Sequence, residues 1–244
     1  MSTVKGLAPR SIVLVTRALW SWTRSWQRLV LFIGVVATIP IHTVCMSTVK
    51  ADQAARTRQL LIRIGRRLFA RRGFDGVSSE EIVAAAEVTR GALYHHFDGK
   101  DGLFREVVAD VMREVHGRLA AAAAGARSPL DGVERGVRAL LQACGKPVYQ
   151  RILFIDGPAV LGWHEWRALD LQFGLGLLRR GLEEATQAGQ IDPPDVETAT
   201  HLLAGALVDG AMLIGRKPGN AAVRRAVEAT MMRLLRGLAR SARA

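Results

Sequence analysis

Apolar residues recur every three to four positions from Ala51 to the end of the chain, which is the spacing of one face of an α-helix. No stretch alternates apolar and polar residues as a strand does, and the valine-rich stretches are short and interrupted. Glycine, proline and capping residues mark where helices should end. The pattern therefore predicts an all-α protein, with helices over residues 52–72, from Ser78 to a turn at Val88, then 89–96, 100–124, 130–143, 146–155, 160–188, 194–215 and 220–240.

Residues 78–104 contain the most specific pattern in the chain. Ser78 and Glu81 have the spacing of a capping box, which starts a helix. After a four-residue turn, Thr89 caps a second, shorter helix that ends before Asp98-Gly99. In a helix-turn-helix the first helix braces the second, whose amino-terminal residues meet base edges in the major groove of DNA. The spacing predicts this motif, although many helical hairpins share it.

The short second helix carries groups that suit DNA. Arg90 can reach guanine acceptors or a phosphate, and Gly91 lets the backbone approach closely. The candidate contacts are Thr89, Arg90, Gly91, Tyr94, His95, His96 and Lys100. Tyr94 could instead be a core residue. The two adjacent histidines point about 100° apart on a helix, so we expect no metal site there.

The charge of the chain favours a polyanionic partner. Its formal net charge is +12 and its pI about 11.0. Residues 50–72 contain eight lysines and arginines and one acid, Asp52, so the excess lies beside the predicted DNA-reading segment. A basic stretch of this kind binds nucleic acid or an anionic membrane surface, or is simply a solvated helix face.

The run GFDGVSSEEIVAAAEVTRGALYHHFDGKDGLF resembles the signature of the TetR/AcrR family of one-component transcriptional regulators. The resemblance covers about 50 residues, from the first helix to the start of the fourth. It implies DNA-facing positions for Ser79 and the seven candidates above, with phosphate contacts at Tyr94, His96 and Lys100. One departure is Glu87, where the family usually has glycine; a left-handed backbone there is less comfortable for glutamate.

Residues 119–244 are expected to form an effector-binding and dimerisation domain of helices. By resemblance, the last two helices pair with those of a second copy, and a small molecule releases the homodimer from a palindromic operator in double-stranded DNA. Aromatic residues cluster between 149 and 173, and either line a ligand pocket or fill the core. The candidate ligand contacts are Phe154, Trp163, Trp166 and Phe173. No nucleophile elbow, phosphate loop or metal-ligand set stands out, so we expect no enzyme and no cofactor.

The first 45 residues differ from the rest. MSTVK occurs at Met1 and again at Met46, which suggests that Met46 is the native start. The domain prediction is therefore an extension over 1–45, a DNA-binding domain over 46–118 and the second domain over 119–244. The uncharged run 29–44 has 16 residues, fewer than the roughly 18 of a membrane span. The alternative function is a membrane-attached sensor or adaptor held by that run, but we expect a cytoplasmic protein without a membrane partner.

Overall fold

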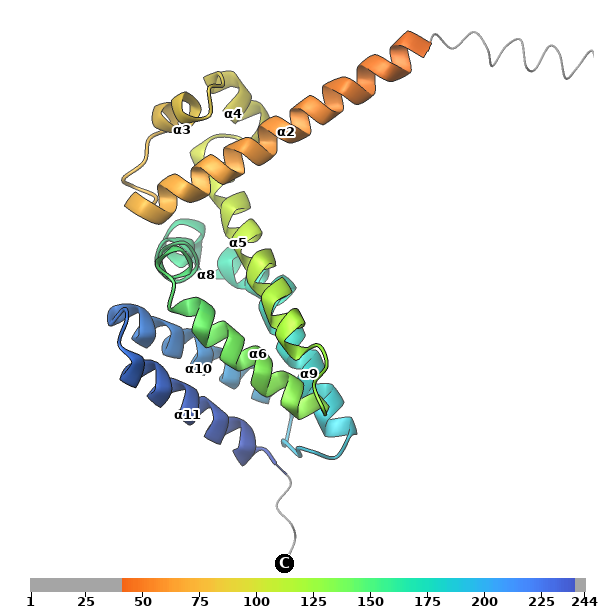
Figure 1. Cartoon of the computed structure of the whole chain (residues 1–244), viewed down its shortest axis with the longest axis vertical. Coiled ribbons are helices and arrows are strands. Elements are labelled where there is room, and N and C mark those ends of the chain that lie inside the picture. The colour runs from red at the N-terminus through yellow and green to blue at the C-terminus, as the bar shows by residue number, and fades with distance from the viewer. Residues whose placement is uncertain (1–40, 240–244) are drawn as a thin grey trace, which may run out of the picture. The chain divides into compact units, whose positions relative to one another are not determined.

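The computed structural model describes the backbone of residues 41–239 and the side chains of residues 50–239 (Figure 1). Within this range the regular elements are all helical, apart from one isolated bridge between Ile191 and Ala239. The predicted all-α fold is confirmed. The residues from Thr57 onward form one compact unit, separate from the unit before it.

The predicted helix-turn-helix is present, with ends close to those expected. From residue 41 onward, three helices precede the long α5 (Lys100–Ala123): α2 (Ile41–Arg72), α3 (Ser79–Ala85) and α4 (Arg90–Phe97). The expected start of the first helix at residue 52 was wrong, because α2 begins at Ile41. No glycine or proline occurs between Pro40 and Gly65 to stop a helix there. The run 29–40 lies outside the described residues, and the native start stays a prediction.

The core of this first domain is built from aromatic and leucine side chains of α2, α4 and α5. Leu61, Leu93 and Leu103 are fully buried. The ring of Phe104 packs edge-on against Phe69, with centroids 5.2 Å apart. This packing holds α4 by its inner face and leaves its outer face to solvent, as the predicted inward positions of Leu93 and Phe97 require.

From the end of α5 to Ala239, the chain contains eight helical segments, which are called the second domain below. They are α6 (Pro129–Cys144), α7 (Pro147–Tyr149), the π-helix η1 (Gln150–Asp156), α8 (Gly157–Asp170), the π-helix η2 (Leu171–Leu175), α9 (Gly176–Gln187), α10 (Val196–Arg216) and α11 (Ala221–Gly237). α6 contacts α5, α9, α10 and α11, and α10 contacts α11 (Figure 1).

The prediction of one helix over 160–188 was wrong. Gly162 has φ 75° and kinks α8, and η2 widens the helix before α9 begins. A residue with positive φ cannot continue a right-handed helix, and glycine adopts it without steric cost.

Helix α10 is long and apolar enough to cross a membrane, and no other helix in the described range is. Its residues Leu203, Leu207 and Ala211 are buried, in contact with neighbouring helices of the second domain. Core helices of globular domains commonly share this length and composition, so the signal carries little weight.

Candidate DNA-reading head and effector cavity

Helix α4 is held at both ends by its own sequence. The Thr89 hydroxyl accepts a hydrogen bond from the amide of Ala92 at 3.3 Å, which caps the amino terminus. Asp98 ends the helix in the left-handed conformation, with φ 57°. Glu87 in the turn before α4 also has positive φ, 54°. The position where glutamate replaces the family's usual glycine thus adopts the backbone that glycine would favour.

The side chains on the leading turns of α4 face solvent. Thr89, Arg90, Gly91, Tyr94 and His95 are exposed, and Tyr94 keeps 47% of its surface. The alternative that Tyr94 is a core residue is therefore wrong. The Arg90 guanidinium lies 3.1 Å from Glu80 of α3 and 5.6 Å from the Tyr94 ring centroid. Both contacts are exposed, so a phosphate or guanine could replace Glu80 at small cost.

The remaining predicted DNA contacts are more enclosed. Ser79 and His96 are half-buried. Burial, followed by the charges of His95 and Arg58, lowers the pKa of His96. The Lys100 ammonium donates to the carbonyls of Phe74 and Val77 at 3.3 and 3.2 Å. Since an ammonium has three donors, Lys100 holds the turn before α3 and retains one donor.

The basic face of α2 divides into paired and unpaired residues. Arg66 pairs with Asp110 at 3.3 Å, and Arg72 pairs with Glu81 at 2.6 Å. Three exposed arginines spaced four residues apart make no ion pair within the described range: Arg63, Arg67 and Arg71. This stripe remains available for an anionic partner.

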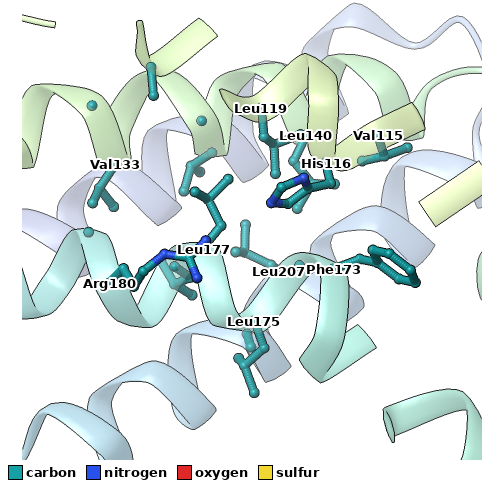
Figure 2. A pocket seen from close by; sticks show the side chains of 18 of the residues that line it. Val115, His116, Leu119, Val133, Leu140, Phe173, Leu175, Leu177, Arg180 and Leu207 are labelled. Carbon is teal, nitrogen blue, oxygen red and sulfur yellow. The ribbon is translucent and has the colours of Figure 1, made fainter. Parts of the chain in front are cut away.

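A partly open cavity of about 550 Å³ lies between α5 and the helices that follow it (Figure 2). α5, α6, η1, α8, η2, α9 and α10 contribute to its wall. Most of the lining is aliphatic or aromatic, with representative residues Val115, Leu119, Val133, Leu140, Leu175 and Leu207. Figure 2 shows two polar side chains, His116 and Arg180, directed toward the interior. The other polar residues of the lining are Arg127, Ser128, Asp170 and Glu184. The size and composition suit a small apolar molecule with few polar anchors.

Three of the four aromatic residues predicted to contact a ligand line this cavity: Phe154, Trp166 and Phe173. Trp163 does not line it; its side chain is 58% exposed and lies at a tilt of 32° to Trp166, with ring centroids 5.3 Å apart. The buried indole N–H of Trp166 donates a hydrogen bond to the carbonyl of Leu153 at 2.8 Å, so its one polar group is satisfied. The sequence prediction missed His116 and Arg180 because single polar residues on amphipathic helices carry no pocket signal.

Asp156 at the end of η1 joins the cavity wall to the candidate DNA-reading head, formed by α2, α3, α4 and the start of α5. Its carboxylate accepts a hydrogen bond from the amide of Phe74 at 2.9 Å and pairs with Arg151 at 3.1 Å. Phe74 lies in the turn between α2 and α3, and Leu153 of the same π-helix lines the cavity. The described contacts thus connect the cavity to the helix-turn-helix through one short segment.

A second link joins α2 to the second domain through Glu114 of α5. Glu114 pairs with Arg66 of α2 and Arg118, and accepts a hydrogen bond from the Tyr149 hydroxyl at 2.7 Å. Burial alone would raise the pKa of Glu114, but these three hydrogen bonds outweigh it and lower that pKa to about 2. The carboxylate is therefore ionised throughout the physiological range.

Two family models and a solved structure match this architecture. The model for bacterial regulatory proteins of the tetR family matches residues 61–107, and that for the tetracyclin repressor-like C-terminal domain matches residues 130–238. A TetR-family transcriptional regulator from Pectobacterium atrosepticum is 30% identical, with a TM-score of 0.67 over 78% of this chain and 97% of that one. The chain belongs to the TetR family.

Other TetR-family relatives show what is shared and what is not. The regulator AcrR of Shigella flexneri is 45% identical over 56 residues, which are 23% of this chain and 26% of AcrR. The alignments with the first curated relatives cover between 26% and 39% of those proteins. The regulator RolR, solved with resorcinol bound, shares the fold at 21% identity and a TM-score of 0.60, over 80% of this chain and 97% of RolR.

Proposed function

We propose that this TetR-family protein is a cytoplasmic transcriptional repressor, which binds a palindromic operator as a homodimer and is released by a small molecule in the cavity. The observation that carries the proposal is the exposed leading face of α4 on a firmly packed head. A recognition helix needs this arrangement, because its side chains must reach base edges while its inner face is buried. The alternative of a membrane adaptor is not favoured by any of these contacts.

The DNA contacts are tested on α4 itself. Arg90→Ala combined with Tyr94→Phe should abolish preference for the operator over random DNA, since Arg90 supplies a base or phosphate contact and the Tyr94 hydroxyl a phosphate contact. Arg179→Ala on α9 removes a distant exposed arginine and is the matched control. An unchanged operator preference in the double variant would contradict the assigned recognition helix.

The homodimer is supported by unpartnered apolar residues on the last two long helices. Leu202 is 70% exposed, Leu213 49% and Leu234 47%, all on α10 or α11. Gly205 lies on the outer side of α10, with nothing near the place a side chain would take. A twofold pair of such faces would bury the leucines and present two heads to successive major grooves.

Release by a ligand requires that the occupied cavity favour a different head position. The contacts of Asp156 and Glu114 give the route, because both join cavity-wall elements to α2 or its following turn. A ligand changes operator affinity only by its preference between the two states; a shift from 1:99 to 99:1 needs a preference of about 5.5 kcal/mol. Titration of operator complexes with a cavity ligand tests this step.

A further inference from the structure

Two adjacent arginines of α9 differ in what they contact. Arg179 lies 3.3 Å from Glu183 and 3.4 Å from Glu197, so two carboxylates balance its charge. Arg180 lines the cavity and has no carboxylate within ion-pair distance in the described part of the chain. Both arginines are exposed, but Arg179 is paired with two carboxylates, whereas Arg180 lines the cavity and is unpaired within the described residues.

The two acids of the cavity wall do not neutralise Arg180. Asp170 also lines the cavity, but its carboxylate pairs with Arg167 at 2.7 Å. Glu184 follows Arg180 by one turn; it is exposed, and no ion pair joins the two side chains. An acid placed four residues after a base on a helix is also the weaker orientation for such a pair.

A hydrogen-bond donor lies on the opposite wall. His116 is half-buried on α5 between the apolar residues Val115 and Leu119, and Figure 2 shows its ring directed into the same space as the Arg180 guanidinium. Neither side chain has a hydrogen-bond partner within the described residues. Guanidinium and imidazole groups bind carboxylate oxygens well, and a guanidinium can do so through two parallel N–H bonds.

From these contacts, and resting on the proposed function, we infer that the effector is a lipophilic carboxylic acid. Its carboxylate binds Arg180, with His116 as a second donor, and its apolar part fills the space lined by Leu140, Leu175 and Leu207. Buried methylene groups supply most of the affinity, and Arg180 supplies the preference for an acid over a neutral or cationic head group.

Three probes with the same ten-carbon chain test this: decanoate, decan-1-ol and decylammonium, titrated calorimetrically into the full chain. Decanoate should bind at least about tenfold more tightly than decanol, because a charge-assisted hydrogen bond is worth that factor or more. Arg180→Gln should weaken decanoate to the level of decanol and leave decanol unchanged. The matched variant Arg179→Gln should alter neither, and Glu184→Gln should strengthen decanoate binding.

The inference is overturned if decanol or decylammonium binds as tightly as decanoate, if none of the probes binds, or if both arginine variants behave alike. These outcomes are separate from a failure of the proposed function, which is measured by operator selection without any ligand. A chain that selects an operator and releases it equally with decanol keeps its function and loses only the assigned ligand class. A chain that selects no DNA loses the function whatever it binds.

Discussion

Replacing Asp156 with alanine tests whether η1 holds the DNA-reading head. The substitution removes the acceptor of the Phe74 amide and the partner of Arg151 together. Asp156→Asn is the graded change, since the amide oxygen can still accept from Phe74 while the charge is lost. Asp75→Ala, at an exposed acid next to Phe74 with no ion pair in the described range, is the control.

The expected cost follows from the burial of the two partners. Asp156 keeps 10% of its side-chain surface and Arg151 44%. Removing one partner of a fully buried pair costs about 3–5 kcal/mol, but water can solvate Arg151 once Asp156 is gone. A hydrogen bond to a charged group is worth about 1.5–3 kcal/mol. We therefore expect Asp156→Ala to lower the free energy of unfolding by about 2–3 kcal/mol, and Asp156→Asn by about 1 kcal/mol.

Two measurements on the full chain check this prediction. Urea unfolding gives the loss of stability, and hydrogen exchange gives its location. In Asp156→Ala the amide of Phe74 should exchange much faster, since its acceptor is absent, and so should the amides of α3 that follow. In Asp75→Ala the free energy of unfolding and the free energy of exchange at Phe74 should both stay within about 0.5 kcal/mol of the wild type.

The reasoning is refuted if Asp156→Ala unfolds at the wild-type urea concentration and the Phe74 amide exchanges at the wild-type rate. That result would mean that Asp156 does not hold the turn between α2 and α3. A loss of stability with unchanged exchange at Phe74 would place the role of Asp156 within the second domain alone.

Further substitutions test other parts of the structure. The folded state depresses the pKa of the Glu114 carboxyl, so the wild type holds a contribution to stability above pH 4.5 and loses it as pH falls toward about 2. Glu114→Gln should remove this contribution. Acid titration followed by circular dichroism checks the prediction, and an unchanged acid midpoint would contradict it. Gly102→Ala should destabilise the head by about 2 kcal/mol or more, because the added carbon would overlap the Phe97 carbonyl. Gly117→Ala has open space around it and should stabilise α5 by up to about 1 kcal/mol. Equal urea midpoints for the two variants would contradict this reasoning. Leu202→Glu should convert the proposed homodimer to a monomer in sedimentation, whereas Leu171→Glu, at a residue 46% exposed on η2, should leave it intact.

The head was predictable because its helix ends are encoded locally. The capping box of Ser78 and Glu81 and the cap at Thr89 appear in the structure as the spacing predicted. The resemblance to the TetR family added the DNA-facing roles, which still await the operator experiments. Lys100 shows the limit of this reasoning, since only the fold reveals that its ammonium also holds the Phe74 and Val77 carbonyls.

The cavity was predictable only in part because distant segments form it. The aromatic residues between 149 and 173 left open whether they line a pocket or fill the core, and three of the four candidates line the cavity. The local sequence did not predict the kink at Gly162, because a glycine within a helical pattern lowers helix stability by only about 1 kcal/mol relative to alanine. The kink and the π-helical turns decide which side chains face inward, and long-range contacts such as that of Trp166 with Leu153 accompany them.

Selection of bound duplexes from random DNA by the full chain, without ligand and at low salt, tests the central claim most directly. The account predicts enrichment of two inverted half-sites, with centres about 10–10.5 base pairs apart or a multiple of that, and loss of this enrichment in the Arg90→Ala, Tyr94→Phe double variant. Enrichment of no sequence, or of the same sequence by the double variant, would contradict it.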